Sequence, residues 1–253
     1  MSEQFTRQSE VMENTQLNNS CVNIPDRYSV SGRINTNKNG LPHEQLTDLD
    51  NRRPIFQPHC SVVEKSLDVD DEKLIERIKW ATTKPNKPVK TADKNIGTLK
   101  KEAEKKEKEW GNSMISQTNN GQWTTLLGEG LVHDVLKLRG ENPIKVEKKG
   151  GFKPDWETDE YIYEVKTSNW WVDGTAGEKV LGTWIKYQEI PELYGKPLRI
   201  ICVANQEYEL EYGKVKYFGK NITKKTKQVL DLASTWSIEY MKFSDLVSNF
   251  NYK

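Results

Sequence analysis

Two carboxylates and a lysine stand close together in the segments Pro154-Asp155-Trp156 and Tyr163-Glu164-Val165-Lys166. Side chains alternate along a strand, so Glu164 and Lys166 point to the same face if this second segment is a strand. The short polar segment 157–160 predicts a tight turn between the two segments. We therefore expect a hairpin that brings Asp155 beside Glu164, with Lys166 on the same side.

This trio suggests metal-assisted phosphate chemistry. Two carboxylates a few ångströms apart form a hard oxygen site of the kind that Mg²⁺ occupies. Mg²⁺ polarises a phosphate, helps to deprotonate a bound water and offsets charge on the leaving oxygen. Lys166 would place a positive charge beside the attacking water and the transition state. Whether Lys166 acts as a base or as an electrostatic stabiliser stays open at this stage, because burial and the carboxylates shift its pKa in opposite directions.

The arrangement Pro154-Asp155, eight residues, then Glu164-Val165-Lys166 resembles the PD-(D/E)xK nuclease motif. The resemblance covers residues 120–205. It implies that the Asp and the Glu bind the metal and that the Lys assists hydrolysis of a phosphodiester. It also implies a further acidic ligand from the preceding helix, where Glu129 stands at the corresponding place.

Within that superfamily the chain looks most like a type II restriction endonuclease, from its compact size and the segment 175–179. This resemblance implies cleavage of double-stranded DNA at a short specific sequence, with Mg²⁺ and without a small-molecule cofactor. It also implies a homodimer, because a two-fold protein matches a palindromic site. The alternatives are a repair, recombination or junction-resolving nuclease with the same centre, or a DNA-binding module without catalysis.

The elements that must position these residues follow from the periodicity of apolar residues. Together they predict an α/β fold with a restriction-endonuclease-like mixed sheet flanked by helices. We expect helices over 70–80, 97–110, 123–138, 175–193, 224–232 and 244–250. We expect strands over 144–146, 152–156, 161–167, 198–204 and 238–243, and a hairpin over 208–218.

The chain divides by composition into residues 1–115, an N-terminal arm and helical region that is partly irregular, and residues 116–253, the catalytic domain. Residues 1–60 are polar and lack a regular period, which predicts an arm for DNA or dimer contacts. His133 and Gln188 are weaker candidates for the site, each with an ordinary role on a helix as the alternative.

Positive charge is concentrated locally, because the net charge of the whole chain is only +1. Residues 213–229 contain six lysines and no acidic residue, and residues 79–108 contain ten lysines and four acidic residues. The second segment is interpreted either as a solvated helix face or as a surface that contacts phosphates. The lysines expected to contact DNA are Lys179, Lys214, Lys216, Lys220, Lys224, Lys225 and Lys227.

The remaining composition limits the cellular setting. The chain has three cysteines, none in a closely spaced pair, which favours a reducing compartment. The first residues lack the apolar segment of a signal peptide, and no run of apolar residues is long enough to cross a membrane. We therefore expect a cytoplasmic protein without membrane partners.

Overall fold

The computed structural model describes residues 67–90, 95–115, 121–171 and 180–251. All of them belong to one unit of the chain, Cys60–Lys253. Among these residues no helix is both long and apolar enough to cross a membrane.

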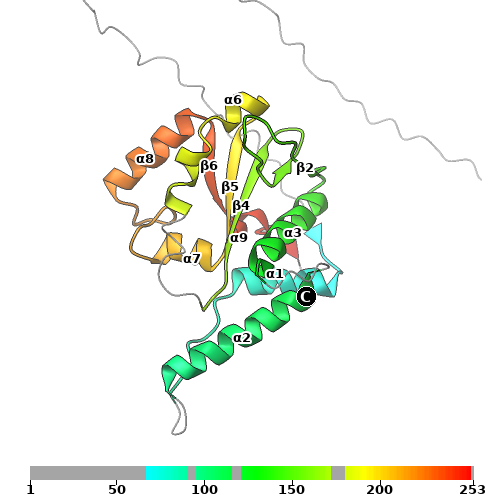
Figure 1. Ribbon diagram of the computed structural model, residues 1–253, viewed down its shortest axis with the longest axis vertical. Helices are drawn as coiled ribbons and strands as arrows, with labels where there is room; N and C mark the ends of the chain where they lie inside the picture. Colours follow the sequence, from blue (N-terminus) through cyan, green and yellow to red (C-terminus); the bar gives the residue numbers. More distant parts are fainter. Residues whose placement is uncertain (1–66, 91–94, 116–120, 172–179, 252–253) are drawn as a thin grey trace, which may run out of the picture. The chain divides into compact units, whose positions relative to one another are not determined.

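A five-stranded mixed sheet forms the centre of this unit (Figure 1), in the order β2-β3-β4-β5-β6. The pairs β2–β3 and β3–β4 are antiparallel, whereas β4–β5 and β5–β6 are parallel. Two further short strands, β1 and β7, pair with each other in parallel. The strands are β1 (Leu67–Asp68), β2 (Ile144–Lys145), β3 (Trp156–Glu157), β4 (Ile162–Ser168), β5 (Leu198–Ala204), β6 (Ile238–Lys242) and β7 (Phe250–Asn251).

Helices cover both faces of the sheet, which confirms the α/β class. One face packs against α1, α3 and α9, and the other packs against α5, α6 and α8. The predicted central strand 198–204 is confirmed, and its continuous apolar sequence follows from this burial on both faces. The helices are α1 (Glu72–Thr82), α2 (Ile96–Met114), α3 (Trp123–Leu138), α5 (Thr183–Lys186), α6 (Ile190–Tyr194), α7 (Asn205–Tyr212), α8 (Lys224–Thr235) and α9 (Phe243–Leu246).

Local sequence features set the start of α1 and the end of α3. Asp71 caps α1 by accepting a hydrogen bond from the Leu74 N–H at 3.1 Å. Gly140, with φ of +83°, follows the end of α3 in the left-handed conformation that glycine adopts without strain. The amphipathic period of α1 buries Leu74 and Ile78 in the same core cluster as α3, β4 and β5.

The structure corrects four predicted elements. The prediction of a single helix over 175–193 is wrong from residue 180 onward, where the chain forms the short helices α5 and α6. Pro191 lies in the first turn of α6. The start of the predicted helix falls in residues 172–179, which lie outside the described residues. The hairpin over 208–218 is wrong, because α7 is a helix that buries Gln206 and Leu210 at helical spacing. The first motif strand is limited to β3, since Pro154 has no N–H for a ladder. The closing helix is only α9, not 244–250.

Candidate active site

The site lies along one edge of β4, which over most of its length has no partner strand among the described residues. β4 pairs with β5 from residue 162 to residue 168 but with β3 only at its first two residues. Asp155 forms hydrogen bonds with the backbone of β4 at this edge. Its N–H donates to the Tyr163 carbonyl at 3.0 Å, and its Oδ2 accepts from the Val165 N–H at 2.7 Å. The carboxylate of Asp155 is thereby fixed beside Glu164.

Glu164 and Lys166 share one face of β4, as the alternation predicted. Lys166 Nζ donates to Glu164 Oε1 in a close ion pair. The Glu164 side chain is only 5% exposed. Its second oxygen, Oε2, is buried and has no hydrogen-bond partner among the described residues. An unpartnered buried carboxylate oxygen is costly, and a cation is the kind of group that would satisfy it.

Burial and nearby negative charge shift the pKa of Asp155. Burial, then the charges of Glu164 and Glu129, raise the pKa of Asp155 to about 8, against the opposing effects of the Val165 N–H and Lys166. The free carboxyl of Asp155 therefore keeps its proton to a higher pH than an ordinary aspartate does. A divalent cation would take the place of that proton, since it neutralises several carboxylates at once.

Glu129 reaches the site because α3 lies very close to β4. A Cβ on Gly128 would lie 1.8 Å from Thr167 Oγ1, so only glycine permits this approach. The Glu129 carbonyl accepts from Trp156 Nε1 at 2.9 Å. Its Oε2 accepts from Lys145 Nζ at 2.9 Å. Glu129 therefore lies near enough to Asp155 to raise its pKa, but its carboxylate is paired with a lysine.

Tyr187 is a site residue that the sequence analysis missed. Its ring is buried, and its centroid lies 5.9 Å from Lys166 Nζ. Burial, then the charge of Glu164 and a hydrogen-bond interaction with its side chain, then the charge of Asp155, raise the pKa of the Tyr187 hydroxyl, which places it beside both carboxylates. Lys186 Nζ donates to the Tyr187 hydroxyl at 3.1 Å. No sequence signal indicated Tyr187, because the expected long helix gave the wrong orientation for this segment.

Two weaker candidates have other surroundings. The His133 ring packs against Trp156, with centroids 4.6 Å apart, and its Nδ1 lies 3.0 Å from Asp134 Oδ1. Gln188 is exposed and lines a surface cavity with Glu189 and Trp236. The contacts of His133 are thus with Trp156 and Asp134.

The lysines expected to contact DNA lie around the start of α8, except Lys179, which falls outside the described residues. α8 packs through Ala233 onto the sheet face that contains Ile162. Glu164 is two residues after Ile162 on β4, so its side chain points to the same face. The aromatic residues Tyr217 and Phe218 in this stretch are buried with Cys202, so they pack in the core. The lysines are Lys214, Lys216 and Lys220 before α8, and Lys224, Lys225 and Lys227 in its first turns; all are exposed except Lys216, which is half-buried.

The carboxylates fit a hard cation in their chemistry, although in the described part of the chain no three His, Cys, Asp or Glu side chains form a ready-made metal site. Asp155 and Glu164 supply oxygens, one of them unpartnered, whereas Glu129 would first have to part from Lys145. In comparisons with known proteins, no family model, curated protein or solved structure matches this chain.

Proposed function

We propose that this chain is a Mg²⁺-dependent endonuclease that hydrolyses phosphodiester bonds of double-stranded DNA. The observation that carries the proposal is the edge of β4 where Asp155 and Glu164 lie together, one Glu164 oxygen receives no hydrogen bond of ordinary length from the described residues and Lys166 stands on the same face. The mixed sheet with helices on both faces is the kind of core expected for a restriction-endonuclease-like fold.

Each residue has a defined task in this proposal. Asp155 and Glu164 would hold the cation, and Glu129 would be a third ligand only without its ion pair to Lys145. Mg²⁺ at this position would supply an activated water and polarise the phosphate. Lys166 presents its ammonium group to the reacting phosphate, where it stabilises developing negative charge. Asp155 would bind the cation as a carboxylate, so its raised pKa would make cation binding release a proton.

The proposed substrate is duplex DNA with a short target, cut by a homodimer of the type II restriction class. The lysines around the start of α8 supply exposed positive charge on the helix layer that packs through Ala233 against the sheet face of Glu164. Contacts of this kind set the affinity and position of DNA but do not read its sequence. A two-fold dimer would present one such centre to each strand of a palindromic target.

The test is incubation of the purified chain with several plasmids and Mg²⁺, followed by gel analysis. Discrete fragments are expected from the wild type and none from Asp155→Asn, which keeps the side-chain volume but loses the charge. Asp159→Asn is the matched control, because Asp159 lies exposed in the turn of the same hairpin. Equal cutting by both variants would contradict the proposal.

Other outcomes select the alternatives. Cleavage of branched DNA but not of plain duplex would identify a junction-resolving or repair nuclease with the same centre. Specific DNA binding by the wild type without cleavage under any divalent cation would identify a non-catalytic DNA-binding module.

A further inference from the structure

The two halves of α2 differ in how they are held. Its buried residues, Glu107 and Gly111, both lie in the second half. A Cβ on Gly111 would lie 2.1 Å from the Trp123 ring, so α2 and α3 are in tight contact there. Glu107 accepts from Trp80 Nε1 at 2.8 Å and from the Trp170 N–H at 3.1 Å. The second half is thus fixed to α1, α3 and the chain after β4, whereas the first half extends away from the sheet (Figure 1).

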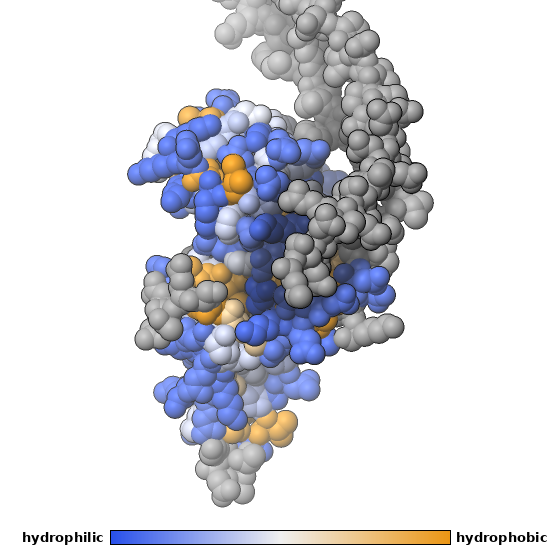
Figure 2. All heavy atoms as spheres, turned by 90° about the vertical axis from the view of Figure 1, so that its right-hand side faces the viewer, coloured by the Kyte–Doolittle hydropathy of each residue, from blue (hydrophilic) through white to orange (hydrophobic). Residues whose placement is uncertain are grey.

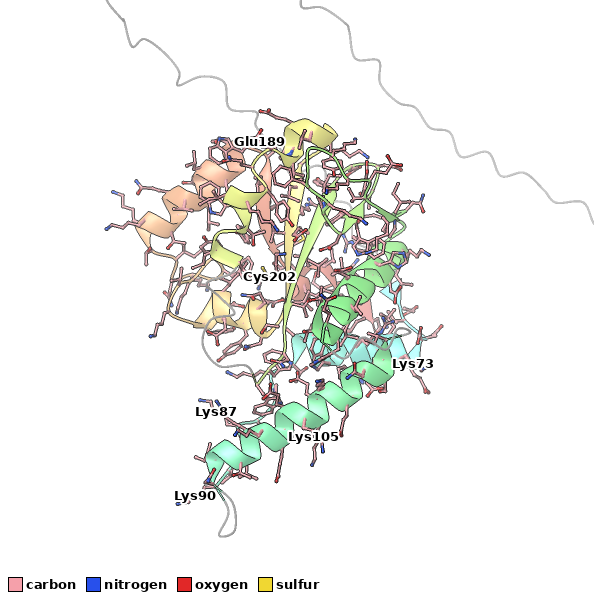
Figure 3. The ribbon with its side chains drawn as sticks, viewed as in Figure 1. Lys73, Lys87, Lys90, Lys105, Glu189 and Cys202 are labelled. Carbon is pink, nitrogen blue, oxygen red and sulfur yellow. The ribbon has the colours of Figure 1, made fainter. Side chains whose placement is uncertain are left out.

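The far end of α2 carries an excess of positive charge. The described residues 83–90 and 95–101 contain five lysines and no acidic residue. Lys87, Lys90 and Lys101 are exposed. Lys87 and Lys90 lie toward this far end, and Lys105 lies farther along the helix (Figure 3). Charge is more balanced in the second half, where Lys105 Nζ lies 3.8 Å from Glu109 Oε1. We call the described residues 83–90 and 95–101 the distal arm.

The distal arm also exposes apolar side chains. Val89 is 82% exposed and Ile96 is 51% exposed. Figure 2 shows an apolar spot of this kind at the lower end of the molecule, beside otherwise hydrophilic surface. Pro85 and Pro88 favour extended backbone between α1 and this end. The arm therefore presents lysines and exposed apolar groups together, on a support that is fixed at its base.

We propose that the distal arm binds the sugar-phosphate backbone of duplex DNA. The choice of DNA among polyanions rests on the proposed function, and on the second lysine-rich surface around the start of α8. Lys87 and Lys90 are separated by about 10 Å of extended chain. A DNA strand carries one phosphate per roughly 3.4 Å of helix axis, so lysines spaced along the arm meet a continuous row of phosphates.

The experiment measures DNA affinity without catalysis. The full chain and a labelled duplex of about 30 base pairs are mixed in EDTA, and Kd is measured by fluorescence anisotropy over a range of salt concentrations. The arm variant is Lys87→Gln, Lys90→Gln and Lys101→Gln together. The matched control is Lys73→Gln, Lys137→Gln and Lys148→Gln, which removes the same charge from exposed lysines outside the arm.

The arm variant is expected to raise Kd about tenfold or more and to reduce the slope of log K against log salt by about 0.9 for each lost phosphate contact. The control variant is expected to stay near wild type, and Lys→Arg at the three arm positions is expected to restore both Kd and slope. Equal Kd and slope for the arm and control variants would overturn the proposal. An equal arm-dependent loss with poly-glutamate as the probe would also overturn it, because the arm would then be a general polyanion surface.

The outcome is independent of catalysis, because EDTA removes the cation. If Asp155→Asn leaves cleavage unchanged while the arm variant binds DNA weakly, the active-site proposal is contradicted and the DNA-binding role of the distal arm is supported. If Asp155→Asn abolishes cleavage while the arm variant binds like the control, the DNA-binding role of the distal arm is contradicted and the active-site proposal is supported.

Discussion

Glu107 and Glu164 are both buried carboxylates, and their surroundings differ in kind. The Glu107 carboxylate accepts hydrogen bonds from Trp80 Nε1 and the Trp170 N–H, which join α2 to α1 and to the chain after β4. Glu164 has one oxygen paired with Lys166 and one without a partner, and it lies beside a second carboxylate, Asp155. A carboxylate that holds a fold together is satisfied by protein donors. One that is crowded by like charge and incompletely paired is a candidate for binding a cation.

The largest expected effect is on cleavage. Lys166→Ala removes the positive charge beside the phosphate, so cleavage is expected to fall by about 10³-fold or more, while DNA binding in Ca²⁺ persists. The measurement is a cleavage series in Mg²⁺ beside a gel shift in Ca²⁺. Lys186→Ala is a useful comparison, because Lys186 contacts Tyr187 rather than a carboxylate. Full cleavage by Lys166→Ala would show that Glu164 is only part of an ordinary ion pair.

The next effect tests how α3 places Glu129. Gly128→Ala forces a Cβ against Thr167, so α3 must shift; we expect destabilisation of about 1–3 kcal/mol. Cleavage is expected to fall together with stability, because Glu129 moves with the helix. Gly130→Ala is the matched control, since a Cβ there meets nothing within 4 Å. That control should be as stable as wild type or more stable by about 0.5–1 kcal/mol in a thermal melt. Wild-type behaviour of Gly128→Ala would mean that the contact is not close in solution.

A smaller effect tests the structural carboxylate. Glu107→Gln replaces one acceptor oxygen by an amide that donates, which faces the N–H groups of Trp80 and Trp170. The expected loss is about 1–2 kcal/mol of unfolding free energy, measured by urea denaturation. Glu104→Gln, on the exposed side of the same helix, should change little. If the two variants are equally stable, Glu107 does not hold α2 in place.

The remaining effect is the pH dependence of stability without a metal. The pKa of Asp155 is about 8 in the folded chain and about 3.9 in an unfolded one. The folded state therefore binds more protons between these values, and the stability from this group is lost as pH rises from about 4 to about 8. Asp155→Asn removes this dependence. Its Tm relative to wild type should rise by several degrees between about pH 6 and about pH 8 in EDTA. A constant Tm difference would show that Asp155 is not crowded by negative charge.

The sequence by itself determined the local features of this protein. Strand alternation put Glu164 and Lys166 on one face, and the short turn put Asp155 beside them, because both follow from backbone geometry over a few residues. The apolar run 198–204 and the amphipathic helices were likewise predictable. The hairpin over 208–218 was predicted wrongly, since a short polar stretch has no strong period and its burial of Leu210 depends on the core around it.

Only the tertiary structure decided which distant residues reach the site. Gly128 packs on Thr167 across the helix–sheet interface, and this contact places Glu129. Tyr187 arrives from a break between α5 and α6 that local propensity did not indicate. The different surroundings of Glu107 and Glu164 also depend on partners far apart in the sequence, such as Trp170 for Glu107. Such contacts form when whole elements pack to exclude water, so their partners are set by the three-dimensional arrangement rather than by spacing along the chain.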